Sequence, residues 1–413
     1  MTDEEAVPQV FEAGQTVQLV VEVKARRDAV SQLHAELQRL VDATHRHDDG
    51  VVRFEVGVDP EDETRYVGYE IWASRDALDR HAAKAHTQHF LSVAKQLVVD
   101  PARPLAATRW VPMRTEAPAR YAVGTTAAAD PPPGFAHQTF TTSDGAKLHF
   151  VTGGSGPTLL LLHGFPNTWY AWRDVMPALA STYRVVAADL RGLGDSTAGG
   201  LPNDVPTGAA DVHELVAHLG CHTVSVIGQD WGGSTALAYA AAYPGEIAHL
   251  GVFEALPRGP WSDTGPGASG PWFADFHRIP DLPETIIAGQ ERTYLEWFYR
   301  AFSATPDVPT TNAVDEYLRT YVQPGKMRSA LARYRGVEQE IAHNTKHLIE
   351  PLRIPVLAVG GATVFGSAVA DNLRSAAANL RSIVIPDCGH YVAEERPADI
   401  ANLIADFLTH SND

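Results

Sequence analysis

The chain has 413 residues, of which 45% are hydrophobic and 20% are charged, a composition typical of a globular protein with two domains. Its net charge of −17 argues against a nucleic-acid surface, and no apolar run reaches membrane-spanning length. The acidic start lacks the apolar stretch of a signal peptide, and Cys221 and Cys388 lie far apart in the sequence. We therefore expect free thiols and a cytoplasmic location.

The first quarter of the chain carries strand and helix patterns in the order βαββαβ. The predicted strands are 17–25, 51–58, 66–72 and 106–111, and the predicted helices are 27–44 and 75–98. This order is that of a ferredoxin-like α+β domain, which we assign to residues 1–113. Because such a sheet is covered on one face, a homodimer formed through this domain is expected.

Residues 114–136 lose this periodicity and are rich in Pro and Ala. We interpret them as a linker, stiffened by Pro131–Pro133. From 137 onward, a hairpin is followed by short apolar strands that alternate with helices: 158–162, 185–188, 224–227, 250–253, 356–359 and 383–385. This alternation predicts a parallel sheet covered on both faces within residues 137–413. The strand-poor, aromatic stretch at about 257–345 predicts a helical lid.

A tight, glycine-flanked turn joins the strand at 224–227 to a helix-prone segment. It reads Gly228-Gln229-Asp230-Trp231-Gly232, the pattern of a nucleophile elbow, with Asp230 where a serine usually stands. A carboxylate at that position can displace a leaving group at an sp³ carbon and form an alkyl ester with the enzyme. The aspartate therefore predicts a different reaction class from that of an ester hydrolase.

Two further segments supply partners for Asp230. His163-Gly164-Phe165 follows a buried strand, so we expect the backbone N–H groups of Phe165 and Trp231 to form an oxyanion hole. His390 follows the last strand, in the order nucleophile first and histidine last. We predict that His390 is the catalytic base.

The acid that orients His390 has two candidates. The loop at 361–366, where such an acid usually lies, contains no carboxylate, and Asp371 stands further along in a predicted helix. Glu254 ends the preceding strand, from whose tip a carboxylate can reach the far nitrogen of the base. We predict Glu254, with Asp371 as the alternative. The acid would fix the imidazole tautomer and stabilise the imidazolium.

From about residue 137 to its end, the chain resembles the branch of the α/β hydrolases that contains epoxide hydrolases and haloalkane dehalogenases. The resemblance is carried by His163-Gly-Phe-Pro with Trp169 and Trp172, by Gln229-Asp230-Trp231, and by Gly389-His390-Tyr391. One departure is Gln229, where histidine usually precedes the nucleophile. The resemblance implies an α/β hydrolase fold with a helical lid and no cofactor.

In the epoxide hydrolases of this branch, lid tyrosines donate a proton to the epoxide oxygen. The segment 332–336 resembles the one that carries such a tyrosine, which makes Tyr334 the predicted general acid. The segment 271–276 has no tyrosine where the second is expected, and Tyr294 and Tyr299 are candidate substitutes. Aromatic lid residues predict a large, flat, apolar substrate, bound by Trp272, Phe273, Tyr294, Trp297 and Tyr299.

Residues about 15–112 resemble the antibiotic biosynthesis monooxygenase (ABM) domains. The match rests on Phe54, Tyr69–Trp72, Ala77–His81, His86 and His89-Phe90. Members of that family oxidise phenolic polyketides without metal or flavin, degrade haem, or do neither. The histidines of this region, His45, His47, His81, His86 and His89, are scattered over helix and loop, so no metal site is predicted.

Together these patterns predict an epoxide hydrolase that forms a vicinal diol through an ester on Asp230. The expected substrate is a small molecule, a polycyclic aromatic polyketide or a similar metabolite, by analogy with the ABM family. One alternative is a haloalkane or haloacid dehalogenase with the same triad. Two others concern the N-terminal domain, which would be a cofactor-free monooxygenase or a dimerisation module only.

Overall fold

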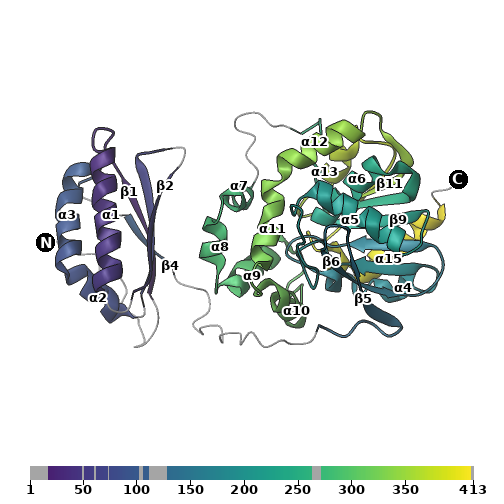
Figure 1. Cartoon of the computed structure of the whole chain (residues 1–413), viewed down its shortest axis with the longest axis horizontal. Coiled ribbons are helices and arrows are strands. Elements are labelled where there is room, and N and C mark those ends of the chain that lie inside the picture. The colour runs from purple at the N-terminus through teal and green to yellow at the C-terminus, as the bar shows by residue number, and fades with distance from the viewer. Residues whose placement is uncertain are drawn as a thin grey trace. The chain divides into compact units, whose positions relative to one another are not determined.

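The computed structural model describes residues 17–48, 51–59, 62–72, 74–101, 106–110, 128–262 and 271–410. The chain divides after Arg120 into two compact units, each with its own hydrophobic core. Figure 1 colours both units from the N-terminus in purple to the C-terminus in yellow. Across the described ranges, no helix has the length and apolar character needed to cross a membrane.

The N-terminal unit is a four-stranded antiparallel sheet with helices on one face (Figure 1). Its elements are β1 (Val17–Lys24), α1 (Val30–His47), β2 (Val51–Val58), β3 (Arg65–Trp72), α2 (Arg75–Ala83), α3 (Ala85–Leu97) and β4 (Ala106–Trp110). The strand order is β2-β3-β1-β4, so the predicted ferredoxin-like fold is confirmed.

The helix predicted at 75–98 is wrong in one respect, because it is broken at Lys84. The backbone of Lys84 is extended, with ψ of 150°, and it ends α2 and precedes α3. The side chains of Lys84, His81 and His86 all contact Asp48, the residue that caps the C-terminus of α1. The helix is therefore broken at the place where three side chains contact a carboxylate from a distant part of the chain. The periodicity of the sequence does not reveal this break.

The C-terminal unit contains an eight-stranded sheet in the order β12-β11-β10-β9-β7-β8-β6-β5. Its strands are β5 (Phe135–Thr141), β6 (Lys147–Gly153), β7 (Thr158–Leu162), β8 (Arg184–Ala188), β9 (Val224–Gln229), β10 (Ile247–Phe253), β11 (Leu352–Gly361) and β12 (Ala377–Ile385). The strands from β7 to β12 pair in parallel as predicted, whereas the hairpin β5–β6 adds two antiparallel strands at one edge.

Helices cover both faces of this sheet (Figure 1). One apolar cluster includes α5 (Val205–His218), α6 (Trp231–Ala242) and α13 (Ala368–Leu373). A second includes α4 (Met176–Leu179), α14 (Val392–Glu395) and α15 (Pro397–His410). The carboxyl ends of the parallel strands carry the turns that hold the predicted active-site residues.

The lid inserted between β10 and β11 is helical, as predicted. It consists of α7 (Trp272–Arg278), α8 (Leu282–Ile287), α9 (Glu291–Phe302), α10 (Thr311–Tyr321), α11 (Lys326–Arg335) and α12 (Val337–His347). Leu295, Phe298 and Leu331 of this lid are buried in the same apolar cluster as α6. Within the lid, α12 contacts both α5 and α6, the helix that follows the predicted nucleophile.

Candidate active site

Asp230 occupies the sharp turn between β9 and α6. Its φ is 52°, a strained value for a residue other than glycine and one that is often found at functional sites. Glycine allows the turn, because a Cβ on Gly228 would come within 2.1 Å of the carbonyl oxygen of Gly232. The Asp230 side chain is 24% exposed and lies at the N-terminus of α6, where the helix dipole attracts negative charge.

The backbone N–H of Phe165 donates a hydrogen bond of 2.7 Å to Oδ1 of Asp230, which is the contact expected of the oxyanion turn. Glycine is needed beside it, since a Cβ on Gly164 would lie 2.3 Å from the Cβ of Asp230. The second expected donor, the amide of Trp231, directly follows Asp230 at the start of α6. Its role in an oxyanion hole stays a prediction.

His390 lies between two carboxylates. Its Nε2 is 3.6 Å from Oδ2 of Asp230, and its Nδ1 is 3.0 Å from Oε2 of Glu254. Burial alone would lower the pKa of His390, but the hydrogen bonds and charges of Asp230 and Glu254 outweigh it and raise that pKa to about 10. His390 is therefore an imidazolium at neutral pH.

Glu254 is fully buried directly after the end of β10. Its Oε1 accepts hydrogen bonds from the backbone N–H of Gly361 at 2.6 Å and of Phe365 at 3.2 Å. The loop that lacks a carboxylate thus supplies N–H groups to the carboxylate of the neighbouring strand. Asp371 lies in α13 and pairs with Arg374, so it makes no contact with His390 within the described ranges.

His390 is also held through its backbone. Gln229, which departs from the pattern of the branch, donates a side-chain hydrogen bond of 2.8 Å to the carbonyl of His390. The N–H of His390 in turn donates to the carbonyl of Phe302, the last residue of α9, at 2.8 Å. The position of His390 therefore depends on both the elbow and the lid.

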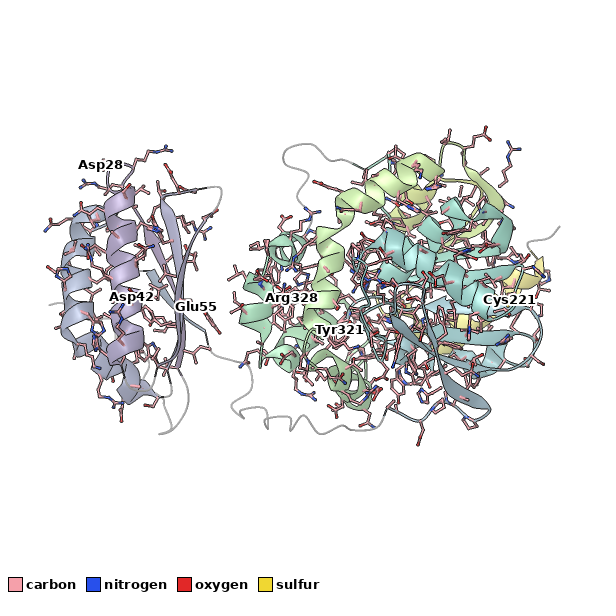
Figure 2. The ribbon with its side chains drawn as sticks, in the orientation of Figure 1. Asp28, Asp42, Glu55, Cys221, Tyr321 and Arg328 are labelled. Carbon is pink, nitrogen blue, oxygen red and sulfur yellow. The ribbon has the colours of Figure 1, made fainter. Side chains whose placement is uncertain are left out.

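Tyr334 lies in α11 with 9% of its surface exposed. Its ring is perpendicular to that of Trp231, with the ring centres 5.0 Å apart, and 6.1 Å from the ring of Phe165. Burial and the charge of Asp230 raise the pKa of Tyr334 well above its usual value, so the phenol keeps its proton. Tyr321, labelled in Figure 2, ends α10 and contacts the ring of Phe165 at 5.9 Å.

The remaining predicted substrate-binding residues differ in how deeply the lid buries them. Phe273 lies 6.4 Å from the ring of Tyr334, whereas Trp272 and Trp297 form an exposed pair 5.2 Å apart. Tyr299 is buried, and its hydroxyl donates to the carbonyl of Pro166 at 2.8 Å, so it supports the oxyanion turn. That bond argues against Tyr299 as a substitute proton donor, and contacts of the others with substrate stay predictions.

His277 is a residue that sequence analysis missed. It is fully buried in α7, its ring lies 4.4 Å from that of Tyr334, and its Nε2 is 2.5 Å from the hydroxyl of Tyr294. Burial lowers the pKa of His277 to about 3, which keeps the imidazole neutral. The sequence offered one signal for His277, its position four residues after Phe273, which places both side chains on one face of a helix. That signal is difficult to recognise in a chain with 18 histidines.

Two groups of side chains in the described ranges bring possible metal ligands within 4.8 Å of one another: Asp48, His81 and His86, and separately His149, Asp189 and Asp195. In the second group, Asp189 is fully engaged in the scaffold. It accepts hydrogen bonds from the backbone N–H groups of Trp169 and Asp195 and lies 2.7 Å from His149 Nδ1. In the first group, one oxygen of Asp48 contacts both histidines.

The alpha/beta hydrolase fold family model matches residues 157–397, more than half of the chain, and the antibiotic biosynthesis monooxygenase model matches 16–92. A soluble epoxide hydrolase from Corynebacterium sp. (strain C12) is 36% identical over 273 residues, covering 64% of this chain and 94% of that protein. A fluoroacetate dehalogenase from Burkholderia sp is 30% identical over 279 residues, covering 63% and 90%. The crystal structure of wild-type Cfl2 from Burkholderia cenocepacia is 38% identical, with a TM-score of 0.62, covering 66% and 96%.

Proposed function

We propose that this chain, which belongs to the α/β hydrolase family, hydrolyses an epoxide to a vicinal diol through an ester on Asp230. The observation that carries the proposal is the position of one carboxylate. Asp230 is held at the elbow by the Phe165 amide and faces His390 at 3.6 Å, and its charge helps to raise the pKa of the Tyr334 phenol. The identity with an epoxide hydrolase over most of that protein's length supports the same reaction class.

The first step would be attack on a ring carbon of the epoxide. Oδ1 of Asp230 is engaged by the Phe165 amide, which leaves Oδ2 as the nucleophile. A bond forms from Oδ2 to the carbon as the ring C–O bond breaks, and Tyr334 transfers its proton to the departing oxygen. The product of this step is an alkyl ester whose carbonyl oxygen is Oδ1.

The second step would be hydrolysis of that ester. His390 takes a proton from water, and the hydroxide adds to Cγ of Asp230. The negative charge then develops on Oδ1, which already accepts the hydrogen bond from Phe165. As this intermediate collapses, its hydroxyl proton passes to the departing alkoxide, which releases the diol and restores the carboxylate. His390 is then again the imidazolium of the resting enzyme, and the proton that it released to solvent after ester formation balances the one regained by the phenolate of Tyr334.

Ester formation would itself switch on the base. In the resting enzyme two carboxylates hold the pKa of His390 at about 10, so its imidazolium is a poor base. Esterification removes the charge of Asp230 and leaves Glu254 as the one remaining carboxylate partner. The pKa of His390 then falls, and the neutral imidazole is produced at the stage that requires it.

The aromatic lid supports a large, flat, apolar substrate. Phe273, Phe298 and Phe302 pack against one another with ring centres 5.1 to 6.1 Å apart, close to Tyr334. Because the N-terminal unit matches the antibiotic biosynthesis monooxygenase family, we propose a polycyclic aromatic polyketide or a similar metabolite. A homodimer through the sheet face that carries no helices of this unit belongs to the same proposal.

Two other functions can be separated by experiment. A dehalogenase would use the same triad, and the relative named a fluoroacetate dehalogenase favours it at 30% identity. Release of fluoride or chloride from a halogenated panel, with no turnover of epoxides, would support that function. A monooxygenase centred on the N-terminal unit would consume oxygen with a phenolic substrate, and its activity would survive Asp230→Asn.

The deciding experiment is mass spectrometry of the His390→Ala variant after incubation with an aromatic epoxide. The peptide that contains Asp230 should gain the full mass of the epoxide, because the ester forms but is not hydrolysed. His410→Ala, at an exposed position in α15, is the matched control and should show no adduct. Turnover by the wild type without any adduct in His390→Ala would rule out the two-step mechanism.

A further inference from the structure

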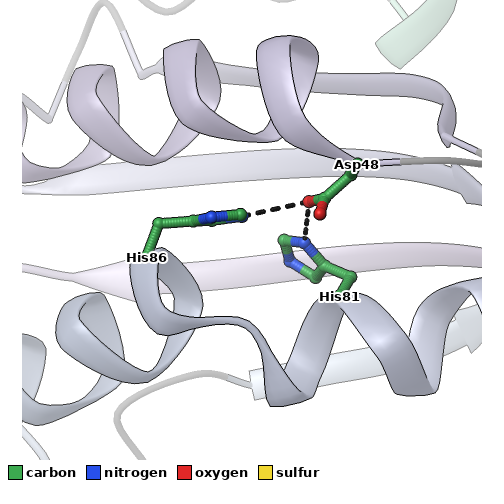
Figure 3. A group of neighbouring side chains, drawn as sticks. All are labelled: Asp48, His81 and His86. Carbon is green, nitrogen blue, oxygen red and sulfur yellow. Dashed lines mark hydrogen bonds and ion pairs between the residues drawn. The ribbon is translucent and has the colours of Figure 1, made fainter.

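Three side chains meet at the break between α2 and α3 of the N-terminal unit (Figure 3). Asp48 caps the C-terminus of α1, His81 lies in the last turn of α2, and His86 lies in the first turn of α3. Oδ2 of Asp48 is 2.6 Å from Nδ1 of His81 and 3.0 Å from Nε2 of His86. One carboxylate oxygen and two imidazole nitrogens therefore point at a common space.

We propose that Asp48, His81 and His86 bind one zinc ion. Two imidazoles with one carboxylate suit a borderline transition metal, whereas calcium and magnesium prefer oxygen ligands alone. Three protein ligands leave one position of a tetrahedral ion open for water or an anionic ligand, the arrangement found in catalytic zinc sites. The site lies within the N-terminal unit and is independent of the hydrolytic site proposed above.

The ligand atoms lie at hydrogen-bonding distances, as expected when a proton rather than a metal ion lies between them. Tetrahedral ligands with bonds of about 2.0 Å lie about 3.3 Å apart, so the two contacts to Asp48 would open by less than about 1 Å. As Nδ1 of His81 binds zinc, its proton can move to Nε2. The hydroxyl oxygen of Thr87 lies 3.3 Å from Nδ1 and 3.4 Å from Nε2 of His81, so it packs against the ring between its two nitrogens.

The surroundings hold the ligands in fixed positions. The Asp48 side chain is 1% exposed and that of His81 is 6% exposed, and the His81 ring packs between Trp72 at 4.5 Å and Phe54 at 5.3 Å. His86 is 18% exposed, which provides a path for an ion from solvent. Ordered ligands with one exposed member reduce the entropy lost on binding without sealing the site.

The positive charge of Lys84 would repel the zinc ion. The ammonium of Lys84 lies 2.7 Å from Oδ1 of Asp48, but its side chain is one-third exposed and can move into solvent. Two helices, α1 and α2, end at the site and direct the negative ends of their dipoles at it, while α3 begins there. Removing the Lys84 charge should therefore strengthen zinc binding, although the same change would weaken a purely structural ion pair.

The test is a zinc titration of the full chain after removal of metal with a chelator, with a chromophoric chelator as competitor. The wild type should bind zinc tightly at one site that His86→Ala and Asp48→Asn each weaken at least about 100-fold. Lys84→Ala should tighten binding by about threefold or more. His89→Ala is the matched control, because His89 lies on the same helix with an exposed side chain, and it should bind as the wild type does.

Cobalt substitution gives a second measurement, since its visible absorption reports the number of ligands. A spectrum of four-coordinate cobalt that disappears in His86→Ala would support the site. The proposal is overturned if the wild type binds zinc no more tightly than His86→Ala, or if Lys84→Ala weakens binding. Circular dichroism of each variant identifies any loss of fold. Asp48→Asn keeps the size of the side chain, so the result does not depend on one substitution.

Discussion

Each unit of the molecule contains a buried histidine bonded to a carboxylate, and the two histidines have opposite properties. In the N-terminal unit, Nδ1 of His81 is 2.6 Å from Asp48, yet burial outweighs that carboxylate and lowers the pKa of His81. In the C-terminal unit, Nδ1 of His390 is 3.0 Å from Glu254, and the pKa of His390 is raised to about 10. His390 has a second carboxylate partner in Asp230, whereas the charge of Lys84 adds to the burial that lowers the pKa of His81.

A histidine–carboxylate pair does not by itself define a base. One carboxylate leaves His81 neutral, with a lone pair available to a metal ion. Two carboxylates keep His390 protonated, and in the proposed mechanism this changes when Asp230 is esterified. We therefore expect the charge on Asp230 to control the protonation state of His390, so that changes in that charge, its partners or the pH should alter the comparison.

The largest effect is expected for Asp230→Asn. It removes both the nucleophile and the charge that keeps His390 protonated, so epoxide turnover should fall by about 10⁴-fold or more. The rate of diol formation checks this. Asp195→Asn is the control, because Asp195 pairs with Arg319 at the base of the lid and not with His390. A residual rate within tenfold of the wild type would contradict the role of Asp230.

Glu254→Gln should lower the turnover number by about 10² to 10⁴-fold. Neutralising Glu254 leaves His390 without a charged partner in the ester state, so hydrolysis of the ester slows more than its formation. Single-turnover kinetics should show a burst of ester followed by slow release of the diol. Asp371→Asn, at the alternative acid, should leave both phases unchanged. Equal slowing of the two phases would count against Glu254 as the orienting acid.

Tyr334→Phe should lower the rate of ester formation by about 10²-fold, because the departing oxygen loses its proton donor. Substrates whose epoxide oxygen leaves more readily should suffer less. Tyr183→Phe, a partly buried tyrosine beside the second apolar cluster, is the control. Unchanged burst kinetics in Tyr334→Phe would show that another group donates the proton. The hydrogen-bonded pair His277 and Tyr294 is the next candidate.

The smallest effect is on stability, and it has opposite signs in the two units. The raised pKa of His390 stabilises the fold fully below about pH 6.5 and loses this contribution as the pH rises to about 10. The lowered pKa of His81 has the reverse effect, because the fold must exclude a proton, so that unit loses stability as the pH falls below about 6.5. Hydrogen exchange of peptides from β10 and α2, compared between pH 5 and 10, separates the two. Parallel pH profiles would contradict the comparison.

Much of the C-terminal fold follows from the sequence, because buried parallel strands are short apolar runs. The strand at 158–162 is predicted with its observed bounds, and Glu254 is predicted as the partner of His390 from its place after a strand beside an empty loop, where it lies 3.0 Å from Nδ1 of His390. Local patterns suffice there, since the strand ends meet at one edge of the sheet. The order of Asp230 and His390 along the chain is similarly informative.

Other features depend on contacts between distant residues and leave no local pattern. The break at Lys84 is associated with Asp48, which stands 36 positions earlier in the sequence. The hydrogen bond from Tyr299 to Pro166 crosses from the lid to the oxyanion turn, and the burial of His277 depends on how α7 packs against α11. Periodicity reports which face of an element is apolar, but not which polar group it will meet.

The central claim is that Asp230 carries the substrate as an ester, and a single turnover in water enriched in the heavy oxygen isotope tests it most directly. With enzyme in excess over epoxide, hydroxide from that water should add to Cγ of Asp230. One heavy oxygen should then remain in the Asp230 peptide, while the diol leaves with an oxygen from the protein. If the heavy oxygen appears in the diol of the first turnover and none in the Asp230 peptide, water attacks the epoxide directly and the account is wrong.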